Sequence, residues 1–207
     1  MAQQERALRT KESVIIAAAE AFAEAGFLGT SMADIFARSG VTKGALYFHF
    51  SSKEELATEI VNGEEAAAAQ LIQDVLASDS APLQKVIDIS FRWAREIQSN
   101  PVVRAGVRLI IEQGTYTNPM PIPYAQWESI VVELLASAQE RGELEPTVDA
   151  KAMAEFVVSA FTGLQIVSQV VSGHDDLIER VERMWQLILI GMLPPGAPIV
   201  LFPPFDR

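Results

Sequence analysis

The chain has 207 residues, enough for one domain or two small ones, and because no apolar run reaches the roughly 18 residues of a membrane span we expect a soluble, cytoplasmic protein with no membrane partner. It contains no cysteine, which excludes disulfides and thiolate metal sites, and it begins with a polar, charged segment where a secreted protein would have a signal peptide. The net charge of −11 is unusual for a nucleic-acid-binding protein, but residues 1–60 carry six basic against eight acidic residues, so most of the excess acid lies further along the chain.

The first forty residues predict two helices. Residues 10–25 place their apolar side chains on one stripe, and Gly26 ends that helix. Ser31 followed by Asp34 is a variant of the capping box, so a short second helix begins there. Gly40 ends it, since a residue at positive φ allows the chain to reverse.

The next segment predicts a third short helix and the start of a fourth. Thr42 caps residues 43–49, and Gly44 in the first turn would let the backbone approach a phosphate closely. The pair Ser52 and Glu55 predicts another capping box. Lys53 lies in that first turn, where it opposes the helix dipole, and a DNA phosphate would explain it. Two helices joined by a tight turn indicate a helix-turn-helix that binds DNA.

The rest of the chain also reads as helices, and no strand alternation competes with them. The expected helices cover residues 53–77, 82–98, 101–114 after the cap at Asn100, 124–141, 150–171 after the cap at Asp149, and 174–193. Residues 115–123 are expected to form a proline-rich loop, and residues 194–207 a proline-rich tail. The fold class is therefore all-α with about nine helices: a helix-turn-helix domain over 1–54 and a helical ligand-binding and dimerisation domain over 55–193.

The last two expected helices are apolar on more than one face. Such a helix lies either in the centre of a core or in an interface, and little chain remains to cover these two. We expect a homodimer through a four-helix bundle, the alternative being monomer core. A two-fold dimer would place two recognition helices about 34 Å apart, which suits palindromic operator DNA.

The segment VTKGALYFHFSSKEEL resembles the DNA-binding signature of the TetR family of bacterial repressors, and RTKESVIIAAAEAFAEAGFLGTSMADIFARSGV resembles its first two helices. The resemblance implies that Phe48 and Phe50 pack in the core of the small domain. It implies contacts to double-stranded operator DNA from Arg6, Arg9, Thr10, Ser31, Thr42, Lys43, Gly44, Tyr47, His49 and Lys53.

The second half resembles one branch of that family, the γ-butyrolactone receptors of streptomycetes. The segments that carry this resemblance are NPVVRAGVRLIIEQG, YAQW, GELEPTVDAKAMAEFVVSAFTGLQIVSQVVSG and DLIERVERMWQLILIGMLP. It implies a repressor of antibiotic or morphology genes that a small hydrophobic autoinducer releases from DNA. It also implies that Trp127 lies over the ligand ring and that Thr162 lies beside the pocket.

Residue pattern adds further candidates for a ligand site. Tyr124 and Trp127 share a helix face, and Thr162 and Gln165 are polar groups in an apolar helix. The latter two need partners when buried, either from the protein or from a ligand. Apolar walls are expected from Trp93, Val107, Leu109, Ile110 and Phe161.

Glu64 departs from relatives that use an uncharged polar side chain to hold the ligand. A buried carboxylate would disfavour an acidic ligand unless paired, and Arg104 and Arg108 are possible partners. We therefore expect a neutral lactone or butenolide in preference to a furan carboxylate. The competing interpretation is an orphan or antibiotic-sensing regulator that does not respond to a lactone.

An enzyme is not expected. The two histidines, His49 and His174, belong to no metal-spaced cluster, His174 is expected to be exposed at a helix start, and no glycine-rich phosphate loop follows a strand. The sequence therefore predicts no catalytic residue, no metal site and no cofactor.

Overall fold

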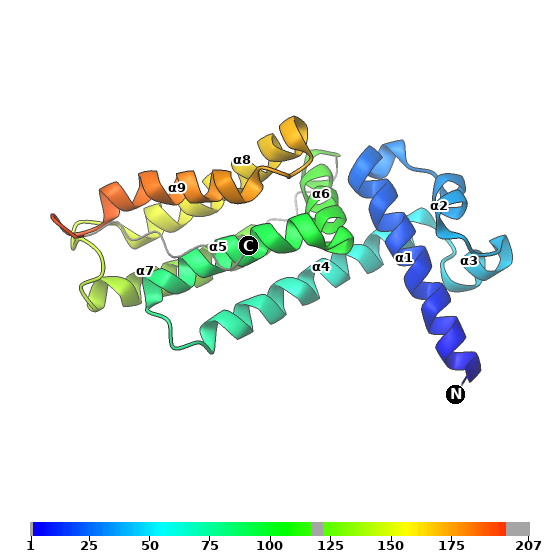
Figure 1. The fold of residues 1–207 in the computed structure, drawn as a ribbon, viewed down its shortest axis with the longest axis horizontal. Helices are drawn as coiled ribbons and strands as arrows, with labels where there is room; N and C mark the ends of the chain where they lie inside the picture. Colours follow the sequence, from blue (N-terminus) through cyan, green and yellow to red (C-terminus); the bar gives the residue numbers. More distant parts are fainter. Residues whose placement is uncertain (1, 117–121, 198–207) are drawn as a thin grey trace. The chain divides into compact units, whose positions relative to one another are not determined.

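The computed structural model describes residues 2–116 and 122–197, and within these ranges the chain forms nine helices and no strand (Figure 1). The predicted all-α class is confirmed. The helices are α1 (Ala2–Gly29), α2 (Met32–Ser39), α3 (Lys43–His49), α4 (Lys53–Leu76), α5 (Pro82–Ser99), α6 (Pro101–Tyr116), α7 (Ile122–Glu140), α8 (Ala150–Ser172) and α9 (Leu177–Met192).

The chain divides into two compact units. The first comprises Met1–Gln70 and Glu96–Met120, and the second comprises Leu71–Arg95 and Pro121–Arg207. Helices α4 and α5 therefore contribute to both units, and α6 belongs with α1 to α3. The domain boundaries expected from sequence, after residues 54 and 193, divide the chain by function and not by compactness, and they stay a prediction.

The caps expected in the helix-turn-helix are present. Ser31 Oγ accepts from the Asp34 N–H at 3.2 Å, and Asp34 Oδ2 accepts from the Ser31 N–H at 2.9 Å, which completes the capping box of α2. Gly40 ends α2 at φ 65°, and Thr42 Oγ1 accepts from the Ala45 N–H at 3.3 Å to start α3. These contacts are local, so the sequence pattern was sufficient to predict them.

Two features of this region differ from the prediction. Helix α1 begins at Ala2 instead of residue 10. Gly26 (φ 73°, ψ 178°) breaks the helical backbone where we expected the helix to end, and a short helical stretch to Gly29 follows the break. At the start of α4, Ser52 Oγ accepts from the Glu55 N–H at 3.1 Å, as expected. The Glu55 carboxylate, however, accepts from the N–H and hydroxyl of Ser51 at 2.7 and 2.8 Å. The capping box is therefore shifted by one residue on its carboxylate side.

Three expectations for the second half also need correction. Helix α6 continues to Tyr116, so Gly114 does not end it, and most of the loop expected over 115–123 lies outside the described residues. Helix α9 begins at Leu177, and His174 lies before it in a turn with φ 77°. Its side chain is buried, whereas we expected it to be exposed.

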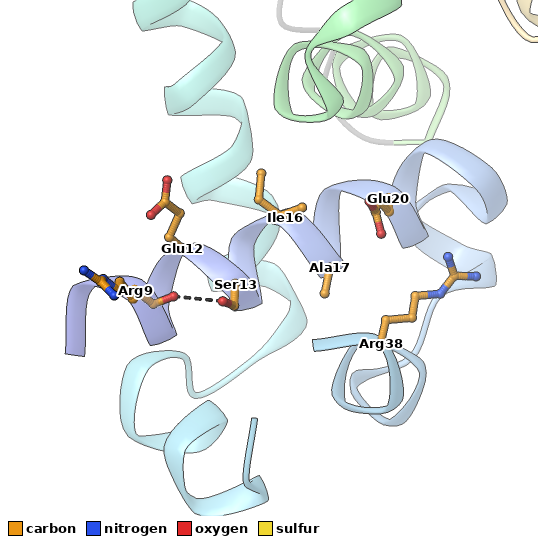
Figure 2. A pocket seen from close by; sticks show the side chains of 7 residues that line it. All are labelled: Arg9, Glu12, Ser13, Ile16, Ala17, Glu20 and Arg38. Atoms are coloured by element: carbon orange, nitrogen blue, oxygen red, sulfur yellow. Dashed lines mark hydrogen bonds between the residues drawn. The ribbon is translucent and has the colours of Figure 1, made fainter. Parts of the chain in front are cut away.

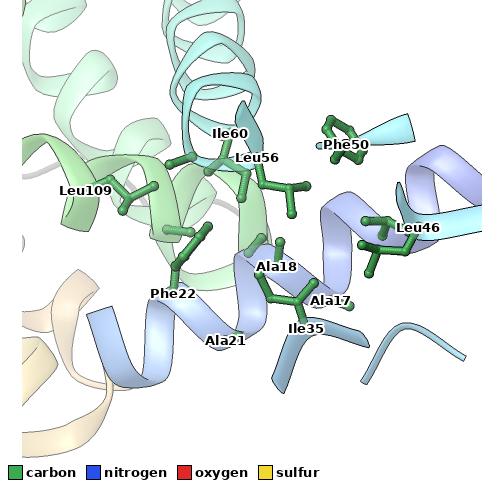
Figure 3. Close-up of a cluster of buried hydrophobic side chains, with 14 residues drawn as sticks. Ala17, Ala18, Ala21, Phe22, Ile35, Leu46, Phe50, Leu56, Ile60 and Leu109 are labelled. Atoms are coloured by element: carbon green, nitrogen blue, oxygen red, sulfur yellow. The ribbon is translucent and has the colours of Figure 1, made fainter. Parts of the chain in front are cut away.

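The core of the first unit is built around α1, whose inward side chains pack with those of the neighbouring helices (Figure 3). Phe22 is fully buried there, and Leu109 of α6 belongs to the same cluster. Phe50 is buried as expected, but the expectation for Phe48 is wrong, because its side chain is 81% exposed. Leu46 and Phe50, four residues apart, share the inward face of α3 and its cap, and Phe48 lies between them on the opposite side.

Candidate DNA-binding surface and ligand-binding residues

The exposed side of α3 is the candidate DNA-binding surface. Leu46 anchors the helix in the core, and Lys43, Gly44 and Tyr47 are exposed. The Lys43 ammonium lies 6.0 Å from the centre of the Tyr47 ring, so a cation and a phenol hydroxyl share one surface. An ammonium and a hydroxyl are the donors that bind phosphate oxygens in DNA.

Gly44 has no structural explanation within the described part of the chain. A Cβ added there would meet no atom within 4 Å, and its φ does not require glycine. Glycine in a helix costs about 1 kcal/mol relative to alanine. A glycine that no internal contact requires is typical of a site where another molecule approaches the backbone.

The other residues expected at DNA lie on α1 and at the caps. Arg6 is exposed, and Arg9 is exposed and paired with Glu5 at 2.7 Å. The Thr10 hydroxyl donates to the Arg6 carbonyl at 2.9 Å. Ser31 and Thr42 use their hydroxyls as helix caps and are exposed, and His49 is half-buried with its ring edge-on to Phe48 at 5.1 Å.

An open hollow of about 490 Å³ runs along α1 beside these residues. Figure 2 shows that Arg9, Glu12, Ile16 and Glu20 reach it from α1, and that Arg38 reaches it from α2. Small-molecule sites are mostly apolar, whereas four of the seven lining side chains here carry charge. We therefore assign this hollow no small-molecule ligand.

Lys53 has an internal role that the sequence did not reveal. Its ammonium donates to the carbonyls of Phe27 and Thr30 at 2.8 and 2.9 Å and lies 4.2 Å from the centre of the Phe27 ring. These contacts explain a lysine in the first turn of α4 without a phosphate. We therefore do not carry Lys53 forward as a DNA contact.

In the second unit, the candidate ligand residues include an aromatic pair. The rings of Trp93 on α5 and Trp127 on α7 lie 5.6 Å apart with a tilt of 49°. Trp93 is buried, and Trp127, Tyr124 and Phe161 are half-buried. Partly covered rings of this kind are typical of the walls of a small-molecule site.

The two polar candidates of α8 differ in how they are satisfied. The Thr162 hydroxyl donates to the Val158 carbonyl at 2.9 Å, so its partner is its own helix. Gln165 is only 6% exposed, and its side chain makes no hydrogen bond within the described residues. A mostly buried amide that makes no such bond has hydrogen-bonding capacity left for a ligand, which makes Gln165 the stronger candidate for a ligand contact.

Four candidates belong to the first unit instead. Leu109 is part of its core, Ile110 is buried, Val107 is half-buried, and Glu64 is only 5% exposed. Their roles toward a ligand stay predictions.

Glu64 has neither of the partners that we considered. Arg104 donates to the carbonyls of Ile97 and Gln98, and Arg108 donates to Glu112 and to two carbonyls of α1. Burial, with a smaller contribution from the neighbouring charge of Glu65, raises the pKa of Glu64 to about 7. Near neutral pH this carboxyl group is thus a mixture of its neutral and ionised forms.

Gly106 of α6 provides the space in which Glu64 lies. A Cβ at position 106 would come within 2.4 Å of the Glu64 Cβ, so any larger residue would displace this side chain. A Cβ added at Gly63 would likewise come within 2.9 Å of Val102 Cγ1 on α6. Helices α4 and α6 therefore approach each other closely at two glycines.

The outer face of α8 and α9 is strongly apolar. Its exposed residues include Phe156, Val167, Val170, Leu187 and Ile190, with exposed fractions from 47 to 81%. By length and composition alone, α8 is the one described helix that could span a membrane, although no apolar run of such length was evident in the sequence.

The turn that joins these two helices is fixed by one carboxylate. Asp176 accepts from the hydroxyls of Ser168 and Ser172 at 2.5 and 2.7 Å and pairs with Arg180 at 2.7 Å. The Arg180 guanidinium and the two hydroxyls hold the pKa of Asp176 well below its usual range. These bonds hold the end of α8 against the start of α9, the two helices that carry the apolar face.

Two family models match the chain. Residues 14–60 match the bacterial regulatory proteins of the tetR family, and residues 80–194 match the tetracyclin repressor-like C-terminal domain. The chain belongs to the TetR family. TetR-family regulators are not enzymes, and they bind operator DNA as dimers and respond to small molecules. An exposed apolar face such as that of α8 and α9 is typical of a surface that another protein chain covers.

Comparison with individual proteins places the chain among a narrower group of relatives than the family models do. The A-factor receptor protein of Streptomyces griseus is 38% identical over 197 residues, which cover 95% of this chain and 68% of that protein. A solved structure of a γ-butyrolactone receptor is 32% identical with a TM-score of 0.80, covering 92% of this chain and 91% of that one. CprB from Streptomyces coelicolor in complex with its biological operator sequence is 30% identical with a TM-score of 0.81, covering 92% of each chain.

The TetR resemblance identified most of the helix-turn-helix but missed the groups that hold it in place. Arg108 and Glu112 of α6 and Lys53 of α4 contact the end of α1. A local sequence signal for such contacts does not exist, since the partners lie up to 85 residues apart. In the sequence, Gly26 marked the place where the helix breaks, but it did not identify the side chains that bind there.

Proposed function

We propose that this TetR-family regulator is a repressor of antibiotic or other secondary-metabolism genes, which binds palindromic operator DNA as a dimer and is released by a small autoinducer of the γ-butyrolactone type. It acts in the cytoplasm, where operator DNA is found. The relatives that are named as receptors of such molecules support the ligand class.

On the DNA side, the proposal depends most on Gly44. A helical glycine with open space around its Cβ, between an exposed lysine and an exposed tyrosine, suits close contact with a phosphate. The proposed DNA contacts are Arg6, Arg9, Thr10, Ser31, Thr42, Lys43, Gly44, Tyr47 and His49.

On the ligand side, the observation that supports the proposal is the unpaired amide of Gln165. An amide can donate to a lactone carbonyl or accept from a hydroxyl group, and either bond would use the hydrogen-bonding capacity that the protein leaves free. The tilted pair of Trp93 and Trp127 would supply apolar contact to a ring or an alkyl chain.

The unpaired state of Glu64 supports a neutral ligand. An acidic ligand beside this residue would meet a second acid and none of the arginines first considered, because Arg104 and Arg108 are engaged elsewhere. We therefore propose a neutral lactone or butenolide in preference to a furan carboxylate.

The proposed mechanism is a shift between two populations of the dimer. One has the spacing of recognition helices that fits the operator, and the ligand binds the other more tightly. Helix α4, which contributes to both compact units, transmits the change. Because the coupling is reciprocal, operator DNA must weaken ligand binding by the same factor, and couplings of about 1–3 kcal/mol give roughly 5–150-fold effects.

The test is release of the purified protein from the DNA upstream of its own gene. We expect a synthetic alkyl-substituted γ-butyrolactone to dissociate the complex in a gel-shift assay, and a furan carboxylate of the same alkyl chain to act only at higher concentration. Binding without release by either compound, but with release by an antibiotic, would support an antibiotic-sensing regulator. Tighter action of the furan acid would contradict the assignment of Glu64.

A further inference from the structure

The end of α1 is a broken helix whose backbone groups are held by α6. The break at Gly26 leaves the carbonyls of Ala23 and Glu24 and the N–H of Phe27 without regular helical partners. Arg108 Nη1 donates to these two carbonyls at 2.7 and 3.1 Å. The Phe27 N–H donates to Glu112 Oε2 at 2.8 Å.

The two α6 side chains also bind each other. Arg108 Nε donates to Glu112 Oε1 at 2.7 Å, and each side chain is only 25% exposed. A guanidinium at the carbonyl end of a helix interacts favourably with the helix dipole, and hydrogen bonds to charged groups are stronger than neutral ones. We call these two residues and the α1 backbone that they hold the α1–α6 clamp.

Gly26 is required by the clamp as well as by its own backbone angles. A Cβ at this position would lie 2.3 Å from Glu112 Oε1 and 3.0 Å from Arg108 Nη2. A larger residue would therefore push the ion pair away from the helix end. This close approach distinguishes the clamp from an ordinary surface ion pair.

The same segment is held from a second helix. Lys53 of α4 donates to the carbonyls of Phe27 and Thr30, and the Thr30 hydroxyl donates to the carbonyl of Gly26 at 2.7 Å. Helix α2 begins only two residues after Thr30, at Met32. The residues that lead into the helix-turn-helix are thus tied to both α4 and α6 by directional bonds.

We infer that the α1–α6 clamp is a coupling element, through which a displacement of α6 moves α1 and therefore changes the position of the recognition helix. This inference rests on the proposed function, because it concerns how a ligand-bound state reaches the DNA-binding surface. Its physical basis is that three hydrogen bonds of fixed direction join α6 to the end of α1, two from Arg108 to carbonyls and one from the Phe27 N–H to Glu112, and they leave α6 little freedom to move without dragging or releasing that end.

The experiment uses the full-length dimer and the variants Glu112→Ala and Glu112→Gln. Operator affinity is measured by fluorescence anisotropy with and without a synthetic alkyl-substituted γ-butyrolactone. We expect Glu112→Ala to weaken operator binding at least fivefold without the lactone, and to reduce the ratio of the two affinities at least fivefold. Binding of the lactone itself, measured by calorimetry, should stay within twofold of the wild type.

The matched control is Glu24→Gln. Glu24 lies on the same segment and pairs with Arg38 of α2 at 2.6 Å, but its side chain makes no hydrogen bond or ion pair with α6 among the described residues. This variant should keep the wild-type ratio. Thermal melting identifies any variant that is poorly folded, and Glu112→Gln, which keeps the shape of the side chain, then replaces Glu112→Ala.

The outcomes separate the two proposals. A wild-type ratio in both Glu112 variants overturns the clamp as a coupling element. If the wild type binds its operator but no lactone releases it, the proposed ligand class fails. The clamp is then judged on the lactone-free arm alone: weakened operator binding together with faster hydrogen exchange of the Phe27 amide supports it, and wild-type values overturn it.

Discussion

The two compact units contain buried polar groups that are satisfied to different degrees. In the first unit, the partly buried cations Arg104, Arg108 and Lys53 are each bonded to backbone carbonyls of neighbouring segments. In the second unit, Gln165 is buried without a partner, and large side chains such as Leu187 are exposed.

The difference indicates where the molecule has groups that only another molecule can satisfy or cover. Groups whose bonds are satisfied internally hold elements in position, whereas an unpaired amide and an exposed apolar face gain free energy only when a partner covers them. We therefore expect the second unit to carry the surfaces for a ligand and for a second copy of the chain. Glu64 is the exception in the first unit, because it is buried and unpaired there.

The largest expected effect comes from the exposed apolar face. Leu187→Glu would place a charge in the dimer interface at a cost of several kcal/mol, so dimerisation should be lost and operator affinity should fall by at least about 100-fold. Light scattering after size-exclusion chromatography and anisotropy with operator DNA measure the two effects. The control Glu182→Gln, exposed on the same helix, should change neither. A dimeric Leu187→Glu protein would place the interface elsewhere.

Glu64→Gln tests whether Glu64 is buried without a charged partner in the first unit. Because the pKa of Glu64 in the folded protein is about 7, against an ordinary 4.5, ionisation costs stability as the pH rises through this window. The wild type should lose about 2–3 kcal/mol more stability than the variant between pH 5 and pH 8. Denaturant unfolding of both proteins across that range measures the difference. Parallel curves would mean that Glu64 is paired or hydrated in solution.

In the second unit, Gln165→Leu replaces the unpaired amide with an apolar group of similar size. Removing a ligand's hydrogen-bond partner costs about 1–3 kcal/mol, so lactone binding should weaken by roughly 5-fold to 150-fold. The dimer should be at least as stable as the wild type, because the amide gains no bond in its ligand-free form. Calorimetry with the lactone and thermal melting measure both quantities. Unchanged lactone affinity would leave Gln165 as a core residue only.

Two lysines of the first unit should respond differently to salt. Lys43→Ala should weaken operator binding and lower the slope of log affinity against log salt by about 1, as expected when one phosphate contact is lost. Lys53→Met should also weaken binding, because it frees the end of α1, but it should leave the slope unchanged. Anisotropy titrations at four salt concentrations give the slopes. A lower slope for Lys53→Met would return this residue to the DNA contacts.

The smallest expected effect concerns Gly44. Alanine is a better helix former by about 1 kcal/mol, and the space around position 44 is open, so Gly44→Ala should stabilise the protein. The added methyl group should nevertheless weaken operator binding, by about fivefold to tenfold if it costs roughly 1 kcal/mol at the DNA backbone. Melting curves and anisotropy on the same preparation test both signs. A variant that binds the operator as well as the wild type would remove the close approach at this position.

The sequence by itself determined the helices and most of their ends. The cap of α2 at Ser31, the turn at Gly40 and the caps at Thr42 and Asp149 depend on groups two to four residues apart. Such contacts form in any chain with this local pattern, so the pattern could be read directly. The family resemblance then gave the order of the helices.

Only the tertiary structure decided which side chains are satisfied. Lys53, predicted to contact a phosphate, binds carbonyls 23 and 26 residues away, and Arg108, considered as a partner of Glu64, binds α1 across 85 residues. Phe48 is exposed because Leu46 and Phe50 already fill the short inward face of α3. The outcomes for Lys53 and Arg108 depend on groups far apart in the sequence, and the burial of α3 depends on which of its faces meets α1, so all three are decided only when the helices pack.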